Sequence, residues 1–250
     1  MSAQDSAARP DRGPRSAWTV IFGRELSAYF SSPIAYIVTG LFLVFSGFFF
    51  FSVFFLVNRA ELRGFFSLLP ILFSFFIPAL TMRLFAEEKR IGTLETLFTL
   101  PVSGFDATMG KFLAALSFSL IMLLPTLAYA LTAAVLGDLD PGPAIGGYLG
   151  AILLAAGYSA VGIYASAITK NQIVAFFIAF SICAFLTLVD KFLIILPAPI
   201  VDTLEFFSAG YHFDSVSRGI IDSRDLLYFA SLTALFLWMT VAAVDDRREA

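Results

Sequence analysis

Six apolar runs, each about long enough to cross a lipid bilayer as a helix, constrain this chain more than any other feature of its sequence. A hydrocarbon core of about 30 Å requires around 20 apolar residues in helical conformation. The runs cover residues 34–57, 65–82, 112–136, 145–169, 173–189 and 226–244. Lipid leaves only helices and closed barrels with satisfied backbone hydrogen bonds, so the runs predict an all-α integral membrane fold with six transmembrane helices.

The composition excludes several classes of protein. Of the 250 residues, 59 % are hydrophobic and 14 % are charged, which disfavours a soluble enzyme or a disordered chain. The net charge of −3 provides no basic field, so no nucleic-acid partner is expected. With one cysteine, Cys183, and one histidine, His212, the chain offers neither a disulfide framework nor a thiolate or histidine metal site. No catalytic and no metal residues are predicted.

The six runs, as bounded above, contain no Asp, Glu, Lys, Arg or His. Proton-coupled carriers and pumps usually require such a group inside the membrane. The sequence therefore argues against a secondary transporter, a charge-lined pore or an intramembrane hydrolase. If this protein moves a substrate, the driving force is expected to come from elsewhere.

The distribution of positive charge predicts the orientation. Eleven of the 16 Lys and Arg residues fall on the side of the N-terminus, whereas five fall on the other side with nine acidic residues. Both termini are therefore expected in the cytoplasm, facing an acidic outer surface. Residues 1–15 are predicted to be a disordered cytoplasmic tail, and no cleavable signal peptide is expected.

Residues 16–32 predict an amphipathic helix ahead of the first run. Trp18, Phe22, Leu26 and Tyr29 recur at helical spacing, with Glu25 near the edge of the apolar stripe. Such a helix can lie in the plane of the lipid headgroups, and Pro33 should end it. The alternative is a frayed leader of the first transmembrane helix.

Residues 83–103 predict a charged helical elbow between the second and third runs. Gly92 should interrupt its first half, and Thr93 could cap a second short helix with Glu95 in the first turn. Such an elbow suits the docking of a cytosolic partner. On physical grounds a solvated connector is equally compatible with the sequence of residues 83–103.

The outer segment, residues 190–225, is too polar to span, and its apolar part fits a short re-entrant element. His212 is expected to be a hydrogen-bonded surface group, and Asp222, Arg224 and Asp225 to mark the membrane edge. In the fourth run, Gly146, Gly150 and the small residues of 157–165 predict close helix packing.

Several segments resemble the ABC-2-type exporter permeases. They are FAEEKRIGTLETLF followed by LPVS over residues 85–103, and GRELSAYFSSPIAY over 23–36. YHFDSVSRGIID, residues 211–222, is similar to the gliding-motility-associated branch of that family. The resemblance implies the transmembrane domain, residues 16–250, of an exporter in the bacterial cytoplasmic membrane. It also implies a cytosolic ABC ATPase that binds ATP and Mg²⁺, a second permease subunit, equal or different, and an auxiliary membrane subunit.

The same resemblance implies which residues contact the ATPase. They lie in the amphipathic helix and the elbow: Trp18, Phe22, Arg24, Glu25, Glu87, Glu88, Arg90, Gly92, Thr93 and Glu95. The chain itself has no Walker A loop, because GFDATMGK, residues 104–111, has the wrong glycine spacing and is followed by Phe112. Asp106 is instead expected to cap the third helix. The alternative function is a membrane-embedded enzyme or assembly scaffold that works at the acidic outer face.

Overall fold

The computed structural model describes residues 16–57, 61–93, 102–192, 205–220 and 222–249, and every regular element within these ranges is helical. Six of the helical stretches are long and apolar enough to cross a membrane, which confirms the predicted fold class. The transmembrane elements are α2 (Pro33–Val57), α3 (Arg63–Thr81), α6 (Gly104–Leu123) continued by η1 (Leu124–Thr126) and α7 (Leu127–Leu136), α8 (Pro141–Ile168), α9 (Gln172–Phe192) and α12 (Ser223–Glu249).

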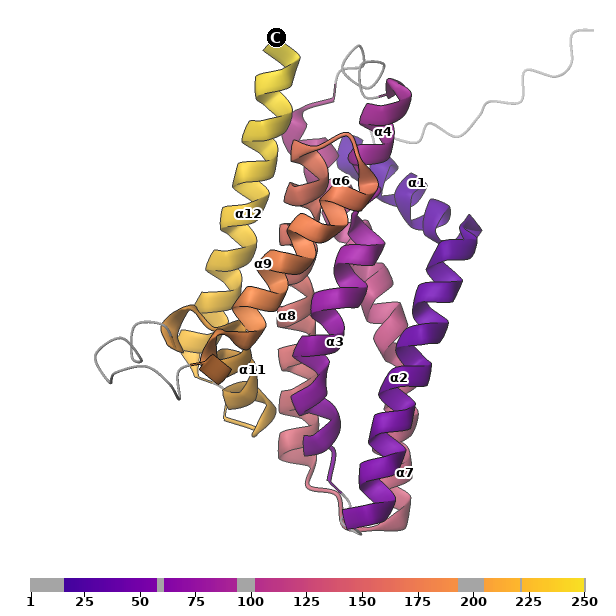
Figure 1. Ribbon diagram of the computed structural model, residues 1–250, viewed down its shortest axis with the longest axis vertical. Coiled ribbons are helices and arrows are strands. Elements are labelled where there is room, and N and C mark those ends of the chain that lie inside the picture. Colours follow the sequence, from indigo (N-terminus) through magenta and orange to yellow (C-terminus); the bar gives the residue numbers. More distant parts are fainter. Residues whose placement is uncertain (1–15, 58–60, 94–101, 193–204, 221, 250) are drawn as a thin grey trace, which may run out of the picture.

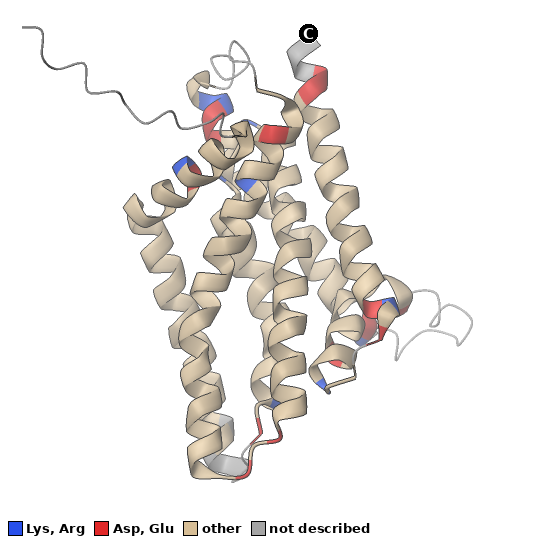
Figure 2. Ribbon diagram, turned by 180° about the vertical axis from the view of Figure 1, so that it is seen from behind, with Lys and Arg blue, Asp and Glu red and all other residues tan. Residues whose placement is uncertain are grey.

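Three shorter helices lie near the two ends of this bundle: α1 (Ala17–Ser31), α4 (Ala86–Ile91) and α11 (Ala209–Ser217). Figure 1 shows α1, α4 and the C-terminal end of α12 at one end of the molecule, whereas α7 lies at the opposite end. Lys, Arg, Asp and Glu residues also gather toward the ends, and the middle of the long helices is free of them in Figure 2. This distribution leaves an apolar zone between two charged ends, as a bilayer requires.

Helix α8 lies at the centre of the bundle and contacts α3, α6, α9, α11 and α12. Its small residues make this position possible. A Cβ atom on Gly162 would overlap the hydroxyl of Thr81 in α3, and one on Gly157 would lie 2.9 Å from Leu232 in α12. The predicted close packing of small residues in the fourth run is confirmed.

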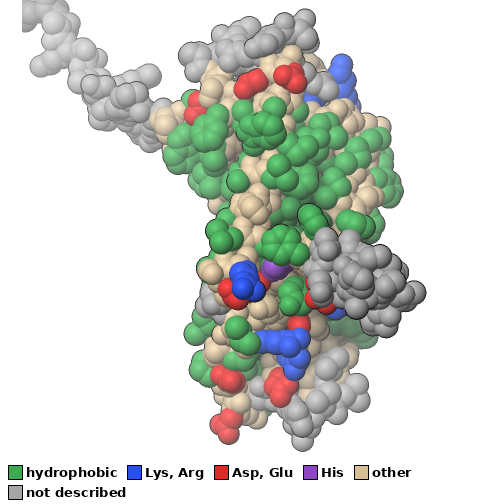
Figure 3. Space-filling view, turned by 90° about the vertical axis from the view of Figure 1, so that its left-hand side faces the viewer, with side chains coloured by type: hydrophobic (Ala, Val, Ile, Leu, Met, Phe, Trp, Pro, Cys, Tyr) green, Lys and Arg blue, Asp and Glu red, His purple; other side chains and the backbone are tan. Residues whose placement is uncertain are grey.

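Large apolar side chains remain exposed on the outer helices. Examples are Val44 and Phe48 on α2, Phe177 on α9 and Trp238 on α12. In Figure 3, hydrophobic side chains cover much of one face between charged groups near the top and in the lower half. Exposed apolar surface of this extent is typical of helices that contact lipid or another subunit.

Two prolines mark changes of helix direction or type. Helix α1 ends at Ser31, Ser32 is extended, and α2 begins at Pro33, which confirms the predicted break. Pro125 lies in η1, between α6 and α7. There the hydroxyl of Tyr148 in α8 donates a hydrogen bond of 2.8 Å to the carbonyl of Thr126, so a neighbouring helix supplies a partner to the irregular turn.

The third transmembrane helix begins earlier than the apolar run suggests. Its N-cap is Ser103, whose hydroxyl accepts a hydrogen bond from the Asp106 amide and donates one to the Asp106 carboxylate. The prediction that Asp106 is the cap was therefore wrong by one turn. Because α6 starts at Gly104, the helix includes Lys111, which directly precedes the third apolar run. Residues 104–111 are helical, so they do not form a phosphate-binding loop.

Candidate functional site: a buried charge cluster joining α1, α4 and α6

Helix α1 lies directly on the first turns of α6. At Gly110 of α6, a Cβ atom would lie 2.8 Å from the Ile21 side chain and 2.8 Å from the carbonyl of Trp18. Ile21 is buried, and Phe22 and Leu26 pack against the core from the same helix. The absence of a side chain at Gly110 therefore allows the two backbones to approach closely.

Four charged side chains meet where α1, α4 and α6 come together. The guanidinium of Arg24 lies 2.7 Å from the carboxylates of both Glu25 and Glu88. The ammonium of Lys111 lies 2.9 Å from the same two carboxylates. Two acids and two bases balance in charge, so this group, termed here the charge cluster, links three helices without a net charge.

Lys111 is the most buried member of the charge cluster. Its side chain has no exposed surface, whereas those of Glu25 and Glu88 are 13 % and 18 % exposed and that of Arg24 is 54 % exposed. The ammonium also donates a hydrogen bond of 2.8 Å to the carbonyl of Leu84 and lies 5.0 Å from the centre of the Phe85 ring. Burial of an ammonium is costly unless such partners surround it.

The electrostatics of the charge cluster are visible at Glu25. Burial by itself would raise the pKa of this carboxyl, but the charges and hydrogen bonds of Lys111 and Arg24 outweigh burial and hold the pKa below its ordinary value. Glu25 is thus ionised in the folded protein and serves as the common acceptor for both cations.

The segment leading into α4 is fixed from the centre of the bundle. The hydroxyl of Ser166 in α8 accepts hydrogen bonds of 2.9 Å from the amides of Phe85 and Ala86. The same hydroxyl donates a hydrogen bond of 2.9 Å to the carbonyl of Met82. One buried side chain therefore satisfies three backbone groups at the junction of α3 and α4.

A second set of contacts holds the end of α1 to the end of α3. The hydroxyl of Tyr29 donates a hydrogen bond of 2.9 Å to the carbonyl of Leu80. Arg83 donates to the Ser32 hydroxyl at 2.8 Å and lies 5.0 Å from the centre of the Tyr29 ring. Helix α1 is therefore held to the end of α3 by these contacts and to α4 by the ion pair of Arg24 with Glu88.

A comparison with known protein families identifies the family of this chain. A family model described as ABC-2 family transporter protein matches residues 54–244, which include α4, Lys111 and five of the six transmembrane elements. The chain belongs to the ABC-2 transporter family. A search of curated proteins found no match. The family match gives no support to the gliding-motility-associated branch in particular.

The ABC-2 family forms the membrane component of transporters. In this ABC-2 chain, the residues predicted to contact an ATPase fall into two groups. Arg24, Glu25 and Glu88 are brought together in the charge cluster. The others line the same end without joining it: Trp18 and Phe22 are half-buried on α1, Glu87 is half-buried on α4, and Arg90, Gly92 and Thr93 are exposed. Glu95 lies outside the described residues.

The predicted elbow of this ABC-2 chain is described only in part. Its first half is α4, which ends at Ile91, and Gly92 follows with φ of 84°. This left-handed conformation is the usual one for a glycine after a helix, and it confirms the predicted interruption. The second short helix predicted after Thr93 lies outside the described residues. The interfacial position of α1 likewise stays a prediction.

Sequence reasoning missed Lys111, which was assigned to the cytoplasm ahead of the third run. The signal was present: Ser103 is a good N-cap, and a helix starting there places Lys111 two turns inside. What the sequence did not show is that Glu25 and Glu88 neutralise the ammonium. The six apolar runs do lack ionisable groups, but the third transmembrane helix begins before its run and includes Lys111.

The outer segment also differs from its prediction. His212, which was expected at the surface, is buried with 4 % of its surface exposed. Asp225, which was expected to mark the membrane edge, is buried with 3 % exposed. Nδ1 of His212 lies 2.6 Å from the Asp225 carboxylate and Nε2 lies 3.1 Å from the carbonyl of Phe206. Asp214 pairs instead with Arg218 on its own helix. Among the described residues no group of three or more His, Cys, Asp and Glu side chains could hold a metal ion.

Proposed function

We propose that this chain is the membrane-spanning subunit of an ATP-driven exporter and works with a separate cytosolic ATPase. The observation that carries the proposal is the charge cluster, which joins α1 and α4 to the transmembrane helix α6. Membership of the ABC-2 family supports an ATPase partner, since ABC transporters use one. The partner would bind ATP and Mg²⁺.

The end that carries α1 and α4 would face the cytoplasm. The excess of Lys and Arg on that side supports this orientation, with both termini inside. Exposed side chains there, such as Arg90, Thr93 and Ile91, would contact the ATPase directly. The membrane would be the bacterial cytoplasmic membrane.

The contacts of α4 suggest how movement of the ATPase reaches the membrane. Helix α4 follows α3 in the chain, binds α1 and α6 through Glu88, and is held to α8 by Ser166. Displacement of α4 would therefore require α6 and α8 to move with it or the charge cluster to break. Packed interfaces of this kind switch between discrete arrangements rather than deform continuously.

The apolar surfaces of α2 and α12 suit lipid and further membrane subunits. Exposed Val44, Phe48 and Trp238 would contact a second permease subunit, an auxiliary membrane subunit or acyl chains. We propose a role in export for envelope or surface assembly on the resemblance of residues 211–222 to the gliding-motility-associated branch alone.

Purification of the chain from native membranes in mild detergent tests the proposal. We expect a copurifying ATPase with vanadate-sensitive hydrolysis, and loss of that ATPase when Arg90→Glu is introduced at the exposed end of α4. Glu205→Gln, at the opposite end of the molecule, is the matched control and should retain it. An intact subunit that never copurifies with ATPase activity would favour the enzyme or scaffold alternative at the acidic outer face.

A further inference from the structure

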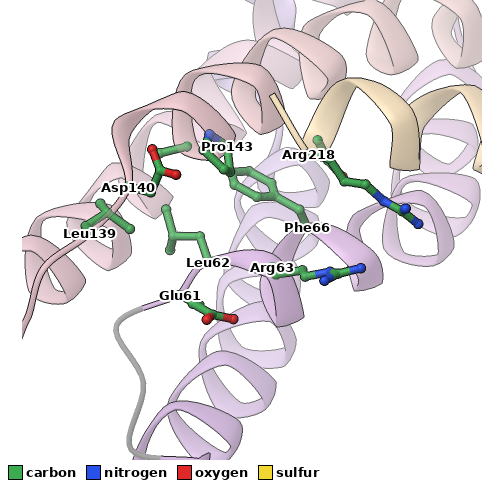
Figure 4. Close-up of a pocket in the computed structure, with 10 residues that line it drawn as sticks. Glu61, Leu62, Arg63, Phe66, Leu139, Asp140, Pro143 and Arg218 are labelled. Carbon is green, nitrogen blue, oxygen red and sulfur yellow. The ribbon is translucent and has the colours of Figure 1, made fainter. Parts of the chain in front are cut away.

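A cavity of about 360 Å³ lies at the end of the bundle opposite α1 and α4. It is formed by the first residues of α3, the first turn of α8 and the end of α11 (Figure 4). Apolar side chains, among them Leu62, Phe66 and Pro143, line much of it. Its volume is within the range of pockets that bind small molecules.

Two arginines from elements far apart in the sequence line this cavity. Arg63 is the first residue of α3, and Arg218 is the C-cap of α11. Arg218 is paired with Asp214 of its own helix, whereas among the described residues Arg63 is within ion-pair distance of no carboxylate. Among the described residues the cavity thus has as many carboxylates as guanidinium groups, but Arg63 is not in direct contact with any of those carboxylates.

The position of Arg63 at the start of α3 also favours a bound anion. The N-terminal end of a helix carries partial positive charge, so a cation there is unfavourable without a nearby anion. The N-cap of α3 is Leu62, which makes no side-chain capping hydrogen bond. By contrast, Asp140 caps α8 through a hydrogen bond of 3.0 Å from the Gly142 amide. An anion in the cavity would therefore be stabilised beside α3.

The carboxylates of the cavity lie apart from the guanidinium groups. In Figure 4, Glu61 and Asp140 are on one side, and the side chains of Arg63 and Arg218 extend toward the other. A ligand with a negative group near the arginines and a positive group near the carboxylates would pair with both kinds of side chain. The apolar side chains between the arginines and the carboxylates would contact an apolar part of the same ligand.

We propose that this cavity binds the headgroup of a zwitterionic phospholipid, with the phosphate at Arg63 and Arg218. Because α3 and α8 are transmembrane helices that begin at the cavity, it lies at the level of lipid headgroups. The ammonium would lie toward Glu61 and Asp140, and the acyl chains would extend along the apolar helices. The proposal does not depend on the ATPase, which would bind at the other end.

Native mass spectrometry of the purified chain in detergent tests this binding, with phosphatidylethanolamine as the probe. We expect one retained lipid per chain and about tenfold weaker retention when Arg63→Gln and Arg218→Gln are combined. Both side chains are exposed, so the double variant should keep its fold, which circular dichroism checks. Arg224→Gln is the matched control, because Arg224 is exposed at the start of α12 but does not line the cavity.

Two further probes separate the sources of the phosphate group. Phosphatidylglycerol lacks the ammonium and should be retained less than phosphatidylethanolamine, because its uncharged glycerol headgroup would not be attracted to Glu61 and Asp140. Inorganic phosphate alone should not displace the lipid. Equal retention by the double variant and the unmodified chain, or displacement by inorganic phosphate at comparable concentration, would overturn the proposal.

Discussion

The ammonium of Lys111 and the carboxylate of Glu25 are 86 residues apart in the sequence and 2.9 Å apart in the fold, with the ammonium wholly buried. Removing one partner of a buried ion pair leaves the other without compensation. The charge cluster should therefore respond very differently to single and to combined substitutions.

Lys111→Met should destabilise the chain by about 3 kcal/mol, because the carboxylates of Glu25 and Glu88 lose their buried partner. Thermal unfolding in detergent measures the effect. The triple variant with Glu25→Gln and Glu88→Gln should recover most of the loss, since no uncompensated carboxylate remains. A single variant as stable as the unmodified chain would show that the charge cluster contributes nothing.

Acidification should weaken the charge cluster through Glu25. Its folded pKa is lowered, so its stabilising contribution is fully present above the ordinary value of 4.5 and is lost as pH falls through the lower folded value. The melting temperatures of the unmodified chain and of Glu25→Gln should differ at neutral pH and converge under acidic conditions. Glu87→Gln is the matched control. The difference between its melting temperature and that of the unmodified chain should not follow this pH profile.

Gly162→Ala should destabilise the bundle by about 1–3 kcal/mol, because the added methyl group would overlap the Thr81 hydroxyl between α8 and α3. Gly40→Ala is the matched control on α2: no atom lies within 4 Å of the new methyl group, and alanine is the better helix former. Melting temperatures should therefore fall for the first variant and stay equal or rise for the second. The reverse order would contradict the central position of α8.

Asp225→Asn should change the environment of the His212 imidazole, because Nδ1 of His212 lies 2.6 Å from the Asp225 carboxylate and Nε2 lies 3.1 Å from the carbonyl of Phe206. His212 is the one histidine in the sequence, so ¹⁵N-histidine labelling gives a single residue to observe. We expect the Nδ1 signal to shift in Asp225→Asn. A His212 spectrum that is the same in Asp225→Asn and in the unmodified chain would contradict the contact between the two side chains.

The sequence predicted the six transmembrane helices because apolar composition alone decides which segments enter lipid. It also predicted the break at Pro33 and the interruption at Gly92, since both depend on the local backbone. The start of α6 was misplaced by one turn because Ser103 and Asp106 are both residue types that cap helices well. The buried position of Lys111 in this helix depends on contacts over 23 and 86 residues, to Glu88 and Glu25, and on the Leu84 carbonyl and the Phe85 ring. Local sequence patterns do not contain these contacts.

The same limit applies to the outer segment. His212 appeared to be a surface group, and Asp225 to mark the membrane edge, because both stand in a polar segment of the sequence. In the fold, the ring of Tyr228 stacks on His212 at 4.2 Å between ring centres, and α11 covers the start of α12. Burial of a polar pair between two elements depends on how those elements pack, which a single sequence does not specify.

The hydrogen bonds of Ser166 have a consequence for how the protein is made. Ser166 accepts a hydrogen bond from the amide of Ala86 and lies 80 residues after it in the sequence. Helix α4 therefore leaves the ribosome long before α8, which carries Ser166. Until α8 has been synthesised and inserted, the amides of Phe85 and Ala86 must be hydrated or bonded elsewhere. The final shape of the α3–α4 junction is therefore reached only after the fourth transmembrane helix has entered the membrane.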